Sequence, residues 1–245
     1  MFVKPSRVLF VVCVLSLCVL PSLAQKKRKV FIPGQPAVVF DDRLAALRAE
    51  PDVKAALQQR LSHGRAVGVL VATKNKSGSS FLRVAVSRNV RGWILSAAIA
   101  RLNSVADGEK MLAAIAATKD DLQKIRMARV CADSLRLPTI APRALFALGQ
   151  AAEHAAEKLS RDADRRLGDN VPDGDLSKRD FELSFNGLDR FNRAGVTFDY
   201  DEAKDVFVYD GAAYRELLRR YPRSAEAAPA RERLAALVGP LQSQE

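Results

Sequence analysis

The stretch Phe81–Leu95, FLRVAVSRNVRGWIL, constrains the fold more than any other part of the chain. Leu82, Val84 and Val86 alternate with polar or small residues, which predicts a β-strand with one apolar face. The NVRGWI that follows predicts a turn and a second short strand. Its glycine lets two backbones approach closely, and Trp93, the only tryptophan, is expected to cover one end of the core. The stretch therefore predicts two paired strands of a small β-barrel.

Residues 1–24 have the pattern of a secretory signal peptide. Lys4 and Arg7 make a positive start, Val8–Leu20 is an uncharged apolar run, and small residues precede a cleavage site after Ala24. The run is shorter than the roughly 20 apolar residues that a membrane helix needs. We therefore expect an exported protein, periplasmic or extracellular, whose only membrane contact is through the uncleaved signal.

The net positive charge of the chain suits contact with anionic partners. The 245-residue chain has 39 Lys and Arg against 28 Asp and Glu, a net charge of +11. Such a protein suits contact with phospholipid headgroups, acidic wall polymers or extracellular nucleic acid, although net charge also serves solubility. Cys13 and Cys18 belong to the leader, which leaves Cys131. Its apolar flanks predict a buried, unreactive thiol.

The region between the leader and the strands at Phe81 admits more than one interpretation. Residues 25–41 are basic and then rich in Pro and Gly, which indicates an exposed linker. Residues 43–65 are rich in helix formers, but Pro51 and a His63-Gly64 turn also suit short strands, so helix and strand both stay open. Residues 73–80, TKNKSGSS, indicate a hairpin loop.

Taken together, Arg43–Ala100 resembles a bacterial SH3-like (SH3b) domain. Leu47-Arg48-Ala49-Glu50-Pro51 corresponds to the Val/Leu-Arg-x-x-Pro opening of that family. RLSHGRAVGVL corresponds to its Leu-x-x-Gly-x-x-Val strand, and FLRVAVSRNVRGWI to its strand, turn and Gly-Trp-Ile/Val ending. The resemblance implies a barrel of about 60 residues with about five short strands, and contact with cell-wall components.

From Ser104 onward the composition changes to Ala, Leu, Glu, Lys and Arg, which indicates a mostly helical region. Apolar residues at three-, four- and seven-residue spacing predict one or two amphipathic helices before Pro138, with an N-cap formed by Thr118 and Asp121 near the middle. Ala141–Gly168 predicts a long helix with an Ala-rich face that a neighbouring helix can approach closely. Residues 168–180 indicate a loop.

The C-terminal part combines short elements. Residues 181–195 predict a helix, and the alternation over residues 196–208 predicts a β-hairpin around DEAK. The segment from Tyr209 onward then predicts two antiparallel helices joined at Pro222, and it resembles a single tetratricopeptide-type unit. The resemblance implies partner binding through Tyr214, Arg215 and Tyr221. The other possibility is that the tyrosines seal this helix pair onto residues 141–168.

Two clusters raise the question of a metal. Residues 169–180 imitate a calcium loop through Asp169, Asp173, Gly174, Asp175 and Asp180. However, its third position is valine and its twelfth is Asp rather than Glu, which favours a solvated acidic turn. Glu153, His154 and Glu157 lie within one helical turn, but zinc normally takes three or four protein ligands, so a surface ion pair is the better interpretation.

Arginines gather in the predicted barrel: Arg43, Arg48, Arg60, Arg65, Arg83, Arg88 and Arg91. Few acidic residues accompany them. Such a face either binds a polyanion or is solvated. Barrels that bind nucleic acid also carry several exposed aromatic residues on which bases stack, and this segment offers few. The binding candidates in this half are Trp93, Arg83 and Arg91.

The sequence contains no Gly-rich phosphate loop, no Gly-x-Ser-x-Gly elbow and no His-Glu-x-x-His helix. We therefore expect no enzyme, no metal and no cofactor. The prediction is an α+β protein with a signal peptide (1–24), a linker (25–41), an SH3-like barrel (42–103) and a helical domain (104–245).

The expected function is that of a non-catalytic exported binding or scaffold protein of the bacterial cell envelope. Its expected partner is a protein or a wall component rather than nucleic acid. The alternatives are a polyanion-binding module and a periplasmic enzyme with an unrecognised carboxylate pair.

Overall fold

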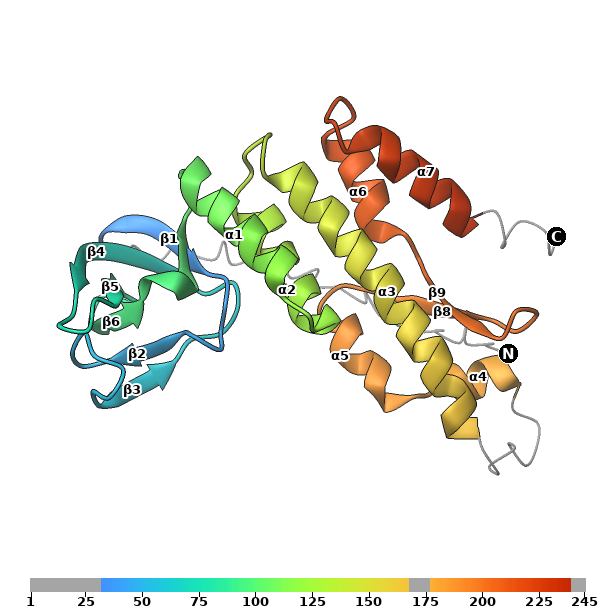
Figure 1. The fold of residues 1–245 in the computed structure, drawn as a ribbon, viewed down its shortest axis with the longest axis horizontal. Helices are drawn as coiled ribbons and strands as arrows, with labels where there is room; N and C mark the ends of the chain where they lie inside the picture. Colours follow the sequence, from blue (N-terminus) through green and yellow to red (C-terminus); the bar gives the residue numbers. More distant parts are fainter. Residues whose placement is uncertain (1–31, 168–176, 239–245) are drawn as a thin grey trace, which may run out of the picture. The chain divides into compact units, whose positions relative to one another are not determined.

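A computed structural model describes residues 32–167 and 177–238. The fold is mixed α/β: an antiparallel sheet comes first along the chain, and helices with one short hairpin follow (Figure 1). The predicted leader and most of the calcium-like loop lie outside the described residues. Within the described ranges, no helix is long and apolar enough to cross a membrane.

Seven strands form the sheet in the order β3-β2-β6-β5-β4-β1-β7, and every neighbouring pair is antiparallel. The strands are β1 (Gln35–Val39), β2 (Ala46–Arg48), β3 (Leu57–Arg60), β4 (Ala66–Lys74), β5 (Ser80–Ala85), β6 (Arg91–Leu95) and β7 (Ile99–Arg101). In the described part of the chain, the end strands β3 and β7 do not pair with each other, so hydrogen bonds do not close the sheet into a barrel.

The structure corrects the linker prediction at its C-terminal end. Residues 35–39 form strand β1, which lies between β4 and β7. Ala37 and Val39 pack into the core of the sheet, while Val38 packs into the helical core. Because both faces are buried over Ala37–Val39, this part of the strand is an apolar run without the alternation of a half-exposed strand.

The region 43–65, for which helix and strand were both open, contains the short strands β2 and β3. Pro51 lies in the turn between them. The strand expected at Phe81 is confirmed as β5, since Val84 and Val86 belong to the sheet core and Leu82 packs against it. The hairpin loop expected before it also forms, because β4 pairs with β5 through the turn at Gly78.

Three helices follow the sheet: α1 (Val105–Ala117), α2 (Asp121–Ser134) and α3 (Ala141–Leu167). The Ser104 hydroxyl caps α1 by accepting from the Asp107 N–H. The predicted cap of the second helix was wrong: Asp120 is its N-cap and accepts from the Gln123 N–H, whereas Thr118 ends α1. Asp120 suits this position because its short carboxylate reaches the free N–H groups of the first turn.

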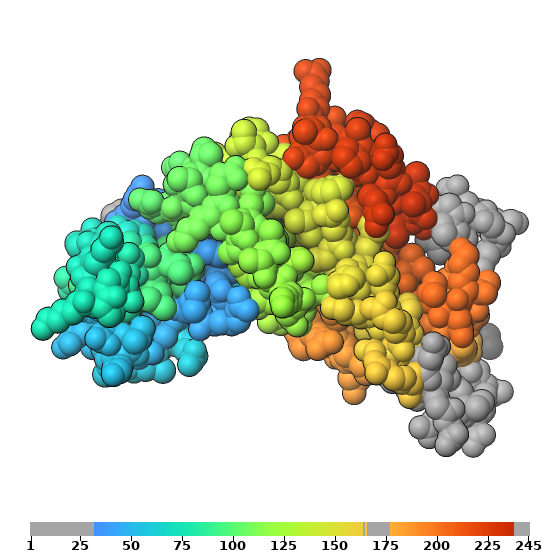
Figure 2. Space-filling view, in the orientation of Figure 1, coloured from blue at the N-terminus to red at the C-terminus, as the bar shows by residue number. Residues whose placement is uncertain are grey.

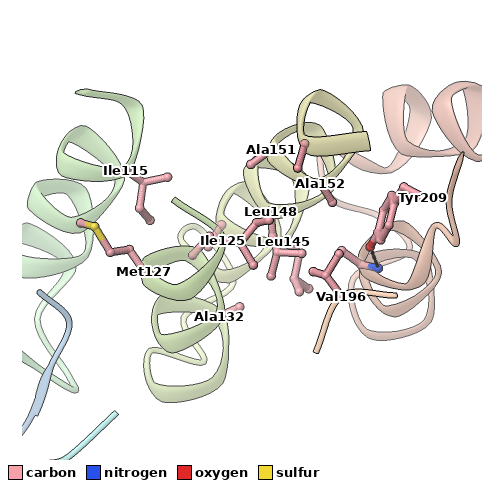
Figure 3. Close-up of a cluster of buried hydrophobic side chains, with 14 of the residues drawn as sticks. Ile115, Ile125, Met127, Ala132, Leu145, Leu148, Ala151, Ala152, Val196 and Tyr209 are labelled. Carbon is pink, nitrogen blue, oxygen red and sulfur yellow. Dashed lines mark hydrogen bonds between the residues drawn. The ribbon is translucent and has the colours of Figure 1, made fainter. Parts of the chain in front are cut away.

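The helical core lies where α1, α2 and α3 meet. Ile115 of α1, Ile125 of α2 and Leu148 of α3 contribute to it (Figure 3). The alanines of α3 allow close approach, as expected, and Ala152 is fully buried. The predicted helix at Ala141–Gly168 is thereby confirmed over the described residues.

The remaining elements are α4 (Lys178–Leu183), α5 (Asp189–Asn192), the hairpin β8 (Phe198–Asp201) and β9 (Val206–Tyr209), and the helices α6 (Ala212–Arg220) and α7 (Ala227–Val238). The hairpin and the final helix pair are confirmed. The single helix expected over 181–195 is interrupted by a 3-10 turn at Asn186–Leu188. Asn and Gly are weak helix formers, which explains a break at Asn186-Gly187.

Candidate binding surface

Four side chains line up across neighbouring strands of the sheet. Trp93 on β6 lies directly opposite Arg48 on β2 and opposite Arg83 on β5. Arg83 in turn lies opposite Val71 on β4. Directly opposed residues of antiparallel strands project from the same face of the sheet. Arg48, Trp93, Arg83 and Val71 therefore form one row, which we call the Trp93 row.

The Trp93 row is on the outer face of the sheet. The residues next to it along the strands, Leu47, Val84 and Ile94, are completely buried in the sheet core, and successive side chains point to opposite faces. Arg83 and Val71 are exposed, and Trp93 is partly exposed. The space-filling view shows atoms of the sheet region, coloured blue to teal, at the surface on the side in view (Figure 2).

This geometry corrects the role expected for Trp93. Ile94, not Trp93, fills the core, because Gly92 and Ile94 share the inward face of β6. The expected role of the glycine is confirmed. A Cβ at Gly92 would lie 2.7 Å from Leu47 Cγ and 2.8 Å from the Arg48 carbonyl oxygen, so only glycine lets β2 pack this closely.

Exposed apolar side chains accompany the arginines. Val71 is 51% exposed, and Leu57, which pairs with Arg48 from β3, is 50% exposed. Of the six large apolar residues exposed in the described chain, five belong to the sheet region: Leu44, Val53, Leu57, Val71 and Val90. Single exposed apolar residues are ordinary, but Val71 and Leu57 share the face of the Trp93 row through their strand pairing, which indicates a contact surface.

The charge around the Trp93 row is positive and largely uncompensated. Residues 32–104 contain eleven Lys and Arg and only four acidic residues. Among the described residues, no carboxylate lies within ion-pair distance of five arginines: Arg60, Arg65, Arg83, Arg88 and Arg91. Arg48 is held in place, because its Nη1 donates to the Ala55 carbonyl oxygen at 2.7 Å.

Two of the four acidic residues in the sheet region, Asp41 and Asp42, already contact side chains outside the Trp93 row. Asp41 binds Arg43 through two side-chain hydrogen bonds of 2.9 and 3.0 Å. Burial opposes ionisation of Asp41, but the hydrogen bonds and charge of Arg43 outweigh burial and hold its pKa below the ordinary value. Asp42 lies 3.0 Å from Nε2 of His63. Arg43 is thus the member of the predicted arginine set that is neutralised.

The structure does not support the predicted partner site at Tyr214. This side chain is completely buried, and its hydroxyl donates to Oε1 of Glu153 on α3 at 2.5 Å. Its ring packs against Phe146 with 5.7 Å between the ring centroids. Tyr214 therefore seals α6 onto α3, which was the other possibility for this helix pair.

Arg215 and Tyr221 lie nearer the surface but have internal partners. Arg215 donates to the carbonyl oxygen of Asp210 and pairs with its carboxylate. The Tyr221 ring lies 5.2 Å from the Arg220 guanidinium carbon, and Tyr221 is half-buried. The six predicted binding residues thus do not form one site: Trp93, Arg83 and Arg91 lie on β5 and β6, and the other three lie in and just after α6.

The described residues include no group of three or more His, Cys, Asp or Glu side chains that could hold a metal. His154 Nδ1 lies 2.8 Å from the buried Asp121, which also accepts from Lys158 at 2.7 Å. The surface ion pair expected among Glu153, His154 and Glu157 is thus replaced by a contact of His154 with the buried Asp121 of α2. Asp180 accepts from the Ser177 hydroxyl at the start of α4.

Two further features bear on whether the chain could supply a nucleophile: the Cys131 thiol and a pocket that contains Ser160. Cys131 is buried, as expected, and burial raises the pKa of its thiol to about 12, so it is no nucleophile at neutral pH. A pocket of about 440 Å³ lies between α3, β9 and α7. Among the described residues that line it, Tyr209 and Ser160 carry hydroxyl groups, and the Ser160 hydroxyl donates to the Ala156 carbonyl oxygen and accepts from the Phe207 N–H.

The sequence matches no protein-family model, no curated protein and no solved structure.

Proposed function

We propose that the chain is a non-catalytic, exported binding protein of the bacterial cell envelope, and that its sheet is an SH3-like recognition module. The observation that carries the proposal is the Trp93 row. It places a partly exposed tryptophan between two arginines on the outer face of one sheet.

The chemistry of this surface suits an acidic wall polymer. Arginines that lack a carboxylate partner are free to bind phosphate or carboxylate groups, and arginine binds both with paired N–H donors. The tryptophan ring and the aliphatic side chains beside it supply flat and apolar contact for the backbone of such a polymer. A single exposed aromatic residue is fewer than single-stranded nucleic acid usually requires for stacking, so we favour a wall polymer.

The helical part serves as a scaffold in this proposal. Tyr209 and Tyr214 are buried: Tyr214 packs α6 against α3, and the Tyr209 hydroxyl of β9 accepts from the Ala213 N–H at the start of α6. The Ser160 hydroxyl both donates and accepts a backbone hydrogen bond, and the Cys131 thiol is buried, so neither offers a nucleophile.

Co-sedimentation with purified bacterial wall material tests the proposal. R83A/R91A removes two exposed arginines of the sheet, and W93A removes the ring between the arginines. Both variants should lose most of the binding. R219A/R223A is the matched control, because it removes two exposed arginines of the helical part and changes the net charge equally. Equal loss in all variants would reject a specific surface.

A further inference from the structure

A second basic site lies away from the Trp93 row, where the loop after β3 meets helices α2 and α5. A pocket of about 330 Å³ is lined there by Arg126 and Arg129 of α2, by Arg193 at the end of α5, and by Ser62 and His63 of the loop; Asp42, Val130 and Ala194 complete the lining. Three arginines thus face one small pocket, and a single carboxylate, that of Asp42, shares it.

The arginines differ in their partners. Arg129 is committed, because its Nη1 lies 2.7 Å from Oε2 of Glu216 on α6. Among the described residues, no acidic group lies within ion-pair distance of Arg126 or Arg193. Asp42 is close to His63, with 3.0 Å between Oδ1 and Nε2. Arg126 and Arg193 therefore have no acidic ion-pair partner among the described residues, while Asp42 adds one negative charge to the lining.

The local sequence explains how the arginines come together. Arg126, Arg129 and Val130 are three and four residues apart, which places them on one face of α2. The loop residue Gly64 lies near that face, since a Cβ there would be 3.8 Å from a methyl carbon of Val130. Glu216 pairs with Arg129, so Arg126 is the arginine of this helical face that is left without an acidic partner among the described residues.

A second observation also points to a polar ligand. Nδ1 of His63 is buried and has no hydrogen-bond partner among the described residues. Nearly all buried polar atoms in proteins have a partner, and an exception calls for an explanation such as a water or an ion. His63 lies at the wall of the same pocket as Arg126 and Arg193.

We infer that this pocket binds a phosphate monoester, with Arg126 and Arg193 as its main ligands. A monoester carries a charge near −2 at neutral pH and three acceptor oxygens, and a guanidinium group without an acidic partner binds phosphate oxygens through paired N–H donors. The volume is at the lower end of the range for ligand pockets, which suits a small phosphorylated molecule. Val130 and Ala194 provide an apolar wall for its organic part. This site is independent of the function proposed for the Trp93 row.

Isothermal titration calorimetry on the full chain at constant ionic strength tests the inference. The probes are inorganic phosphate, glycerol 3-phosphate and dimethyl phosphate, whose single charge represents the diester of lipids and wall polymers. Glycerol 3-phosphate should bind at least tenfold more tightly than dimethyl phosphate. Equal binding of the two would overturn the assignment of a monoester.

Variants show whether the pocket is the site. R126A/R193A should weaken binding of glycerol 3-phosphate at least tenfold, and R126K/R193K should weaken it less, since lysine keeps the charge but loses the paired donors. R219A/R223A and R83A/R91A should stay within twofold of the unmodified chain. Arg193 is exposed, so R193A alone provides a folded variant if the double variant fails to fold. Unchanged binding in R193A and R126A/R193A would overturn the inference.

Discussion

Two adjacent residues of β6 show how a shift of one position along a strand moves a side chain from the core to the outer face of the sheet. Ile94 is completely buried in the sheet core, whereas Trp93 faces outward between Arg48 and Arg83. The larger side chain is therefore not the one on which stability depends. The signal for this was present in the sequence, because an inward Gly92 requires Trp93 to face outward.

We predict opposite effects for these two residues. I94A should lower the free energy of unfolding by about 2–5 kcal/mol, as deletions of large aliphatic side chains in cores do. W93A should cost about 1 kcal/mol or less, since most surface substitutions have small effects, and it should lose most of the wall binding. Urea denaturation measures both. A W93A variant less stable than I94A would place the tryptophan in the core after all.

At the scale of elements, Gly149 of α3 should tolerate no side chain. A Cβ there would lie 2.4 Å from the buried Tyr214 ring of α6. In a helix, Gly→Ala normally gains up to about 1 kcal/mol, but overpacking a core costs about 1–3 kcal/mol. We therefore expect G149A to be destabilised in thermal unfolding. Q150A, at the exposed neighbouring position, is the control and should be nearly neutral. A stabilised G149A would contradict the close contact of α3 and α6.

The contact between α2 and α3 should depend on pH through Asp121. Burial opposes ionisation of Asp121, but hydrogen bonds and charge from Lys158 and His154 outweigh burial and lower its pKa. A carboxyl group whose pKa is lowered by folding stabilises the fold above its unfolded pKa of about 3.9, and this contribution is lost as pH falls through the folded pKa. The stability difference between the unmodified chain and D121N should therefore be full at pH 7 and shrink at pH 3. A difference that stays constant would contradict this role.

Much of the element order could be predicted from the sequence, because it depends on local patterns. The alternation at Phe81–Leu95 predicted β5 and β6, and Pro138 predicted the end of the α2 region. Strand β1 was missed because both of its faces are buried, so no alternation marks it. The pocket at Arg126 and Arg193 was missed for a different reason: it joins residues 67 positions apart, and only the tertiary fold brings them together.

At the scale of the whole described chain, sheet and helices share buried contacts. Val38 and Ala100 from the strands belong to the same core as Met111 and Ile125 from the helices. The sequence predicted separate barrel and helical domains, whereas these contacts couple them. We expect one unfolding transition in urea, with the same midpoint for Trp93 fluorescence, which reports on the sheet, and for circular dichroism at 222 nm, which reports on the helices. Two separated midpoints would show that the parts unfold independently.

The central claim is that the Trp93 row binds an acidic wall polymer, and the salt dependence of that binding tests it most directly. The affinity for a purified anionic wall polymer is measured at several salt concentrations for the unmodified chain, R83A/R91A and R219A/R223A. Because arginine contacts release counterions from a polyanion, R83A/R91A should bind more weakly and with a shallower logarithmic salt slope, by at most about 1.4 for two contacts. R219A/R223A should keep the affinity and slope of the unmodified chain. A slope that R83A/R91A leaves unchanged, or that R219A/R223A lowers equally, would contradict the claim.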